Sequence, residues 1–179
     1  MFELLRADCQ ANVKAPLSIM LLAVYRYGNW LHRKVRIPVA FQVLRVFYIV
    51  ACVLITYVIC GSQIPAQCTI GKGLKLDHPF GIIISPDAVI GGHCSIMHQV
   101  TIGSLDGASP ILENEVFIGT GAKILGPVII GKKAIIGVNA VVLEDVPPGG
   151  TAVGIPARVI KITETSAREA LFERNLSLD

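Results

Sequence analysis

The sequence predicts a mainly β chain in which short strands wind into a parallel β-helix behind an N-terminal α-helical segment. Three observations predict this fold. After residue 61 an aliphatic residue recurs every six positions, Ile-Gly dipeptides recur with it, and residues 17–60 carry long apolar stretches instead. A sustained six-residue period fits neither an α-helix nor an alternating strand, and it is typical of hexapeptide β-helices.

Three hexapeptides form one coil. Each hexapeptide supplies one short strand and one corner of that coil. The aliphatic side chain points into the prism, and the Gly or small residue after it fits the tight corner. Four coils result, with these interior residues: Ile64, Ile70 and Leu76; Ile84, Ile90 and Ile96; Ile102, Leu112 and Ile118; Ile124, Ile130 and Ile136. Residues at the same place in each coil form a column, with about 4.8 Å between coils.

The chain divides into a helical segment over 1–60, a β-helix over 61–162 and a tail over 163–179 that we expect to be helical. Because repeats stack only on their neighbours, both ends of the β-helix need caps, which the helices and the tail would supply. Within the helical segment, Leu17, Met20, Leu21, Val24 and Leu31 predict an amphipathic helix whose other side carries Arg26, Asn29 and Arg33.

A second apolar stretch follows Pro38, and its last fifteen residues, 46–60, carry no charge. A membrane span needs about twenty apolar residues. Three interpretations are therefore open, which we rank in this order: a buried helix, a helix lying in the membrane interface, and a true span. The basic run HRKVR at 32–36 keeps the interfacial interpretation in consideration.

Composition and charge exclude several classes of protein. Of 179 residues, 53% are hydrophobic and 16% are charged, against about 25% charged in a typical soluble domain. A disordered chain and a nucleic-acid-binding basic arm are excluded. Residues 1–60 carry a net charge of +5, seven basic against two acidic, and the remainder carries nine against eleven. We expect a cytoplasmic protein. Its basic end is compatible with peripheral contact with the inner face of a membrane. The alternative, which we favour, is an ordinary pair of helices with solvated basic edges.

The cysteines give no sign of a metal site or of a disulfide framework. There are five, an odd number, at irregular spacing and without a CxxC pair. No small-residue cleavage site follows the apolar residues 17–24, so we expect no signal peptide. Nucleotide-cradling and nucleophile-elbow motifs are absent from the sequence.

Two histidines mark a candidate site. His78 and His98 each follow an interior residue by two positions, so they share one outer edge, one coil apart, and Thr120 and Val138 continue that line. A ten-residue gap in the repeat inserts a loop over 103–111, and loops on a rigid scaffold commonly build binding sites. His is the usual general base near neutral pH.

Four stretches resemble the serine acetyltransferase branch of the hexapeptide acyltransferases: KLDHPFG at 75–81, CSIMHQVTIG at 94–103, IGTGAKILG at 118–126 and VPPGGTAVGIPARV at 146–159. The helical segment resembles that of short branch members in polysaccharide biosynthesis. The resemblance covers about residues 60–162. It implies a left-handed β-helix, acetyl-CoA as co-substrate with no permanently bound cofactor or metal, and a homotrimer with active sites between subunits.

The resemblance also implies roles for residues. His78 matches the catalytic base, which takes the proton from an acceptor hydroxyl as that oxygen attacks the thioester, and His98 is the second candidate. Asp77 matches a residue that contacts the acceptor. The implied CoA-binding residues are Gly103, Thr120, Val138, Gly154, Pro156, Ala157, Arg158 and Lys161, with Lys132 and Lys133 as further candidates for the phosphates.

The sequence departs from the serine acetyltransferase pattern at positions around the catalytic His and the acceptor. Gln63 stands where serine acetyltransferases have the carboxylate that orients the catalytic His. Ala108 and Ser109 replace the Arg-His pair that grips the serine carboxylate, which leaves that carboxylate without a charged partner. We therefore expect O-acetylation of a sugar hydroxyl in a glycan or glycan precursor. The alternatives are L-serine O-acetylation and, without enzymatic activity, a catalytically weak trimeric scaffold.

Overall fold

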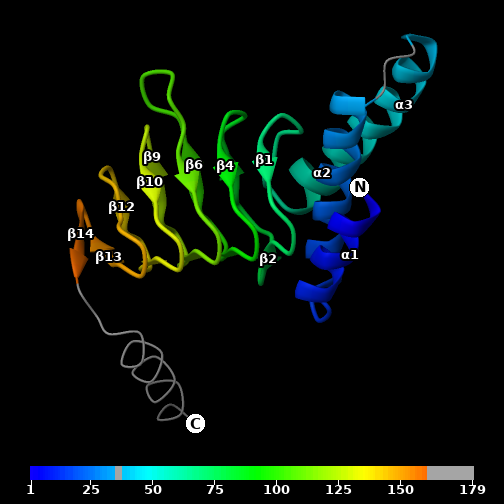
Figure 1. Cartoon of the computed structure of the whole chain (residues 1–179). Helices are drawn as coiled ribbons and strands as arrows, with labels where there is room; N and C mark the ends of the chain where they lie inside the picture. Colours follow the sequence, from blue (N-terminus) through cyan, green and yellow to red (C-terminus); the bar gives the residue numbers. More distant parts are fainter. Residues whose placement is uncertain (35–37, 161–179) are drawn as a thin grey trace.

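A triangular solenoid with a helical segment at one end makes up the chain (Figure 1). The structure is a computed structural model and describes residues 1–34 and 38–160. The helical segment comprises α1 (Phe2–Ala11), α2 (Pro16–Lys34), α3 (Pro38–Ala51) and η1 (Cys52–Ile59), a π-helix that continues α3.

Three sheets form the faces of the prism, and each is named here by its first strand. The β1 face holds β1 (Thr69–Ile70), β4 (Val89–Ile90), β7 (Ile111–Leu112) and β10 (Ile129–Ile130). The β2 face holds β2 (Lys75–Leu76), β5 (Ser95–Ile96), β8 (Phe117–Ile118), β11 (Ile135–Ile136), β13 (Thr151–Gly154) and β14 (Ala157–Ile160). The β3 face holds β3 (Ile83–Ile84), β6 (Thr101–Gly103), β9 (Lys123–Leu125) and β12 (Val141–Val142).

The predicted columns of interior residues are confirmed by the strand register. On the β2 face, parallel pairing aligns Leu76 with Ile96, then Ile118, then Ile136. The β1 and β3 faces repeat this register at their own interior positions. Each strand from β1 to β12 pairs an outward residue with a buried aliphatic one, so the core is built of Ile, Leu and Val side chains along the axis of the solenoid.

Close packing of the corners explains the glycines that follow the interior residues. A Cβ atom on Gly71 would lie 2.6 Å from the backbone of Gly91, and one on Gly91 would lie 2.6 Å from the backbone of Glu113. Those distances are far inside van der Waals contact. The corners therefore stack backbone on backbone, as the repeat predicts.

The open edge of the first coil is satisfied by side chains from the helices. A first coil has no preceding coil, so its backbone groups need other partners. The helices supply these bonds: Tyr25 Oη to Cys68 O at 2.9 Å, Asn12 Nδ2 to Leu74 O at 2.8 Å, Ser18 Oγ to Leu76 O at 2.7 Å and Asn29 Nδ2 to Ala66 O at 2.8 Å. Asn12 Oδ1 in turn accepts from the Leu76 N–H at 2.9 Å. The helical segment thus caps this end.

A buried ion pair lies at the centre of this cap. Arg26 Nε lies 2.8 Å from Asp8 Oδ2, and the two side chains are 2% and 0% exposed. Arg26 also donates to the carbonyls of Ile70 and Gly71, at 2.7 and 2.6 Å. Asp8 Oδ1 accepts from the Gly73 N–H at 3.0 Å. Each charge therefore has several partners besides the other.

The structure corrects the predicted orientation of α2 in part: Leu21, Val24 and Leu31 are buried as expected, but two other residues are not. Arg26, expected on the solvated side, is buried, whereas Met20, expected on the apolar side, is 46% exposed. The physical reason is that α2 packs on the edge of a coil, where unpaired carbonyls and N–H groups select polar side chains. A helix orientation predicted from apolar periodicity assumes that the helix packs on an apolar core. It therefore does not detect a polar strand edge as the packing partner.

At the other end, β13 and β14 form an antiparallel hairpin that closes the solenoid. Its two arms pair from Thr151 with Ile160 to Gly154 with Ala157. The tail predicted to be a helical cap, 163–179, lies outside the described residues.

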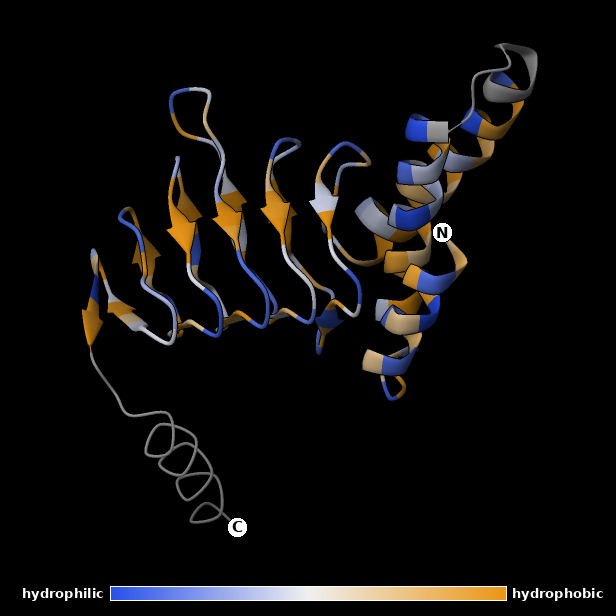
Figure 2. Ribbon diagram, in the orientation of Figure 1, coloured by the Kyte–Doolittle hydropathy of each residue, from blue (hydrophilic) through white to orange (hydrophobic). Residues whose placement is uncertain are grey.

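The helix formed by α3 and η1 is not buried, so the first-ranked interpretation of this stretch is wrong for the chain. Only 6% of the eighteen-residue stretch Gln42–Ile59 is buried, although it is long and apolar enough to cross a membrane by length and composition. Figure 2 shows hydrophobic residues along this helix, in the helical segment at one end of the solenoid.

We predict that Asp8→Ala lowers the free energy of unfolding by about 3–5 kcal/mol, because it leaves the buried Arg26 charge without its counter-ion. Urea denaturation followed by circular dichroism measures this. The matched control is Lys132→Ala, which breaks an exposed ion pair with Glu115 at 3.3 Å and should cost at most about 1 kcal/mol. Equal losses in the two variants would contradict the assigned role of the buried pair.

Candidate active site

His78 and His98 lie side by side on the edge between the β2 and β3 faces. His78 follows β2 and His98 follows β5, one coil further along. Their ring centroids are 5.6 Å apart, with the rings nearly perpendicular at 77°. The predicted juxtaposition of the two imidazoles is therefore confirmed.

The two rings differ in their surroundings. His78 is exposed, whereas His98 is half-buried and its Nδ1 atom is buried without a hydrogen-bond partner among the described residues. An unsatisfied buried polar atom costs about 1–3 kcal/mol. A group from a bound molecule or a second subunit that pairs with Nδ1 would recover that free energy.

The backbone that carries His78 is held by the chain leaving η1. The hydroxyl of Ser62, which is buried, donates to the carbonyl of Pro79 at 2.8 Å and accepts from the Ile82 N–H at 3.0 Å. The Gly81 N–H donates to the carbonyl of Cys60 at 3.0 Å. Ser62 thus acts as a positioning residue for the turn after His78, and no motif in the sequence singles it out.

Asp77 lies next to His78 in sequence, in a half-buried position. Its carboxylate pairs with the ammonium of Lys75 at 2.9 Å. The pair is partly exposed, so water screens it and the carboxylate keeps free lone pairs. This position agrees with contact to an acceptor, and the role stays a prediction.

Gln63 occupies the first coil on the β3 face. Its backbone pairs with Ile83, through an N–H donated to Ile82 at 2.7 Å and a carbonyl that accepts from Ile84 at 2.9 Å. The side chain is exposed and makes no hydrogen bond to His78 in the described part of the chain. The sequence-based role of Gln63 beside His78 therefore also stays a prediction.

Thr120 and Val138 continue the line of the two histidines, as expected from the repeat. Thr120 is half-buried and Val138 exposed, each one coil beyond the previous residue. At the usual strand spacing the four residues span about 14 Å along the prism edge. This length suits an extended arm lying along the solenoid.

Four further residues expected to bind CoA lie at the far end of this line. Gly154 ends β13, Pro156 lies in the turn, and Ala157 and Arg158 begin β14. The Arg158 guanidinium is exposed and lies 3.9 Å from the carboxylate of Glu144, too far for a strong bond. Lys161 lies outside the described residues.

Gly103, in contrast, is not near Thr120 in this chain. It ends β6 and stacks beside Leu125, at the opposite end of the strands of the β3 face. The predicted site residues therefore lie on two edges of one face: the histidine line on one, and Gly103 with the following loop on the other.

That loop is a tight hairpin. Leu105 and Ala108 exchange backbone hydrogen bonds at 2.9 and 3.0 Å. Asp106 and Gly107 between them both have positive φ, as a two-residue hairpin turn requires. The Ser109 hydroxyl lies 2.9 Å from that of buried Ser85, which fixes the base of the hairpin. Sequence reasoning did not identify Ser85.

Two buried thiols of the solenoid, those of Cys68 and Cys94, do not provide a nucleophile. Burial raises the pKa of Cys68 to about 12 and raises the pKa of Cys94 as well. Both thiols are therefore protonated near neutral pH, and no cysteine is paired in a disulfide. Imidazole is the proton acceptor that this edge of the molecule presents.

Comparison with known proteins identifies the family. The bacterial transferase hexapeptide (six repeats) family matches residues 109–144. A serine acetyltransferase of Helicobacter pylori (strain J99) is 38% identical over 149 residues, covering 80% of this chain and 81% of that protein. The chain belongs to the serine acetyltransferase branch of the hexapeptide transferases. The predicted resemblance is thus confirmed.

Other relatives of this branch are longer. The serine acetyltransferase of Synechococcus elongatus is 36% identical over 143 residues, which cover 78% of this chain and 55% of that protein. The chain thus spans about half the length of several curated relatives. Both relatives are serine acetyltransferases, and the predicted link to polysaccharide biosynthesis gains no support from them.

Solved structures of the branch superpose on most of the chain. Soybean serine acetyltransferase gives a TM-score of 0.74 at 32% identity, covering 88% of this chain and 67% of that one. The Brucella abortus enzyme in complex with coenzyme A gives 0.74 at 29% identity, covering 89% and 67%. The predicted left-handed parallel β-helix is confirmed.

We predict that His78→Ala lowers turnover by about 10²–10⁴-fold, the usual contribution of a general base. CoA affinity should change little, because the residues expected to bind CoA lie further along the edge. His98→Ala should act more weakly, through positioning. Steady-state turnover and calorimetric CoA binding on both variants check this. Loss of turnover in His98→Ala alone would reverse the two roles.

Proposed function

We propose that the protein is an acetyl-CoA-dependent O-acetyltransferase. The observation that carries this proposal is the His78–His98 pair on the solenoid edge of a serine acetyltransferase-branch protein. His78 accepts the proton of the acceptor hydroxyl while that oxygen attacks the thioester carbonyl carbon. The carbon–sulfur bond then breaks, the acetyl group stays on the acceptor oxygen, and the CoA thiolate leaves and takes up a proton.

L-serine is the acceptor that the relatives favour. The Helicobacter pylori protein, matched over four fifths of both chains, is a serine acetyltransferase. A soybean enzyme of the same fold is known in complex with serine, with a TM-score of 0.74 at 31% identity. In this proposal Asp77, half-buried next to His78 in sequence, accepts a hydrogen bond from the ammonium group of such an acceptor.

A sugar hydroxyl is the second candidate, and one observation favours it. The hairpin loop over 103–111 holds Asp106 and contains no Lys or Arg, and the Ser109 hydroxyl is already engaged with Ser85. A free amino acid brings a carboxylate that this loop would repel or leave unpaired. A neutral hydroxyl acceptor carries no such group.

Assembly belongs to the same proposal. We place the complete site between subunits of a homotrimer, because the site residues of one chain lie on two separate edges of the β3 face. A neighbouring copy would bring one of these edges against the other. It would also offer a partner for the buried Nδ1 of His98.

The acceptor is tested by comparing L-serine, L-serinamide and a panel of sugars in a CoA-thiol release assay. If serine is the acceptor, its carboxylate is recognised, and kcat/KM for serine should exceed that for serinamide by about tenfold or more. Equal values for serine and serinamide, together with a faster sugar, would instead establish the second candidate. No CoA release with any acceptor would contradict the transferase proposal and favour the scaffold.

The assembly is tested by light scattering during gel filtration. A homotrimer has a mass three times the 19.2 kDa of the chain. We expect that mass for the active protein. An active monomer would show that one chain holds a complete site.

A further inference from the structure

An apolar surface covers the helix formed by α3 and η1. Figure 1 shows this helix beside α2, running from the tip of the helical segment at α3 to the first coil, which the chain enters after η1. Its exposed apolar side chains, up to 70% exposed at Val58, are the following: Val43, Val46, Phe47, Ile49, Val50, Val53, Leu54, Tyr57, Val58 and Ile59. These residues are called the apolar face below.

The apolar face is wide. At 100° per residue, the exposed side chains from Val43 to Val50 cover about 160° of the circumference of α3. The opposite side holds the half-buried Leu44 and Tyr48, which lie toward α2, where Tyr27 Oη donates to the Leu44 carbonyl at 3.2 Å. A helix that packs on a single partner helix needs only a narrow stripe, whereas one immersed in a membrane interface presents a broad face.

The charge around the apolar face is basic. Between Asp8 and Asp77 the sequence contains no acidic residue. Asp8 itself is buried and neutralised by Arg26, so it does not offset the exposed Lys14, Arg33 and Arg45. A second copy seated face to face here would bring the same positive charge. An anionic surface would neutralise it.

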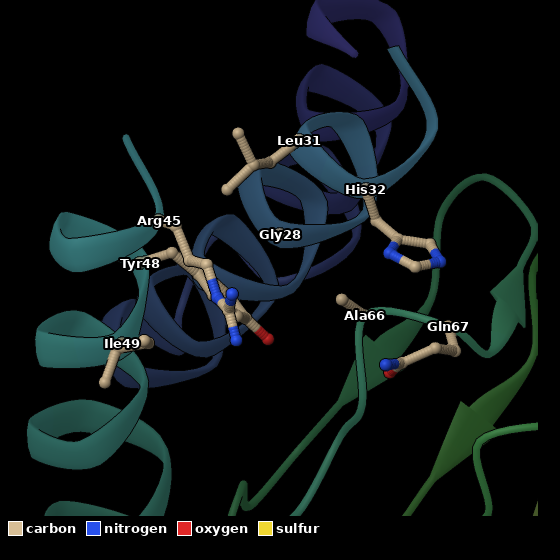
Figure 3. A pocket seen from close by; sticks show the side chains of 8 residues that line it. All are labelled: Gly28, Leu31, His32, Arg45, Tyr48, Ile49, Ala66 and Gln67. Carbon is tan, nitrogen blue, oxygen red and sulfur yellow. The ribbon is translucent and has the colours of Figure 1, made fainter. Parts of the chain in front are cut away.

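A cavity of 360 Å³ opens beside the apolar face, between α2, α3 and the first coil (Figure 3). Its polar lining includes Arg45, His32 and Gln67, and its apolar lining includes Ile49 and Leu31. The Arg45 guanidinium is exposed and forms no ion pair with any residue that the structure describes. This combination of a free cation next to apolar side chains suits a phosphate headgroup and the start of its acyl chains.

The helix is tied to the solenoid at its C-terminal end and packs along α2 on one side. The chain leaves η1 at Cys60 and enters the first coil at once, where Ser62 is buried and hydrogen-bonded. Before α3, helix α2 is fixed along its length by its bonds to the first coil, including Arg33 to Thr69 Oγ1 at 3.0 Å. The helix thus runs alongside α2 instead of standing alone, an arrangement that allows it to lie in a membrane surface rather than cross it.

We propose that the apolar face binds the surface of a bilayer containing anionic phospholipids, with the helix parallel to the membrane plane and Arg45 among the headgroup phosphates. This inference does not depend on the acceptor. It is tested by flotation of the full-length chain with vesicles of phosphatidylcholine alone and of phosphatidylcholine mixed with phosphatidylglycerol. We expect flotation with the mixed vesicles at low salt, and weaker flotation with neutral vesicles or at high salt.

Two variants of the helix locate the contact. Val50→Glu should lower the partition coefficient at least tenfold, because it places a charge in the middle of the apolar face. Its matched control is Leu143→Glu, at a side chain of similar exposure (49% against 52%) at the far end of the solenoid, which should float like the parent protein. Arg45→Gln, which keeps the apolar face intact, should lower binding to the anionic vesicles about fivefold and leave neutral vesicles unaffected.

Several results would overturn the proposal. One is parent protein that stays in the soluble fraction with anionic vesicles at low salt. Another is equal flotation of Val50→Glu and its control. A third is a change of oligomeric state by Val50→Glu without any lipid binding by the parent protein, which would assign the face to a second copy of the chain.

The orientation is tested by the depth of a single tryptophan. Trp30 is the only tryptophan in the sequence, so a Val50→Trp, Trp30→Phe double variant reports on the middle of the helix alone. Phospholipids brominated near the headgroup end of the acyl chains should quench the fluorescence of this tryptophan more than phospholipids brominated near the bilayer centre. The opposite order would show that the helix spans the membrane.

Discussion

The structure depends on satisfying the open edge of its first coil. Every later coil finds its hydrogen-bond partners in the coil before it, but the first has none. Asp8, Asn12, Ser18, Tyr25 and Arg26 provide them in place of a preceding coil, at distances between 2.6 and 3.2 Å. Burying an Arg–Asp pair is costly unless both groups are fully hydrogen-bonded. The backbone edge of the solenoid meets that condition, because its carbonyls and N–H groups point at the pair.

This cap fixes more than the end of the solenoid. It holds α2 against the first coil, and α2 in turn holds α3 and η1 beyond it. The chain then passes from η1 through Cys60 and Ser62, whose contacts fix the turn after His78. Capping, the exposed helix and the candidate catalytic edge are therefore parts of one hydrogen-bonded arrangement, although the residues lie far apart in sequence.

How far the sequence predicts this arrangement depends on the kind of contact. The columns of the solenoid are predictable because each repeat meets an identical neighbour, so a period of six fixes which side chain is inside and where His78 and His98 meet. The cap is not predictable in this way. In the sequence, Asp8 and Arg26 look like ordinary charged residues of a basic segment, because no neighbouring residue indicates that they face a strand edge. Ser62 and Ser85 also cannot be identified from the sequence, because a buried hydroxyl that bonds to one loop leaves no sequence pattern.

For the exposed helix, composition alone leaves several interpretations open. The way in which the helix is attached to the rest of the chain distinguishes between them. An apolar stretch of this length fits a core helix, an interfacial helix or a span equally well. The structure excludes the core by exposure, and it disfavours a span because α3 packs along α2, which is itself hydrogen-bonded to the first coil. The same contacts place His78 at the end of the solenoid that carries the apolar face. An acceptor held at a membrane surface would then lie at the same end of the molecule as His78. The identity of the acceptor and membrane binding can therefore be tested separately, although both concern the end of the solenoid that carries His78.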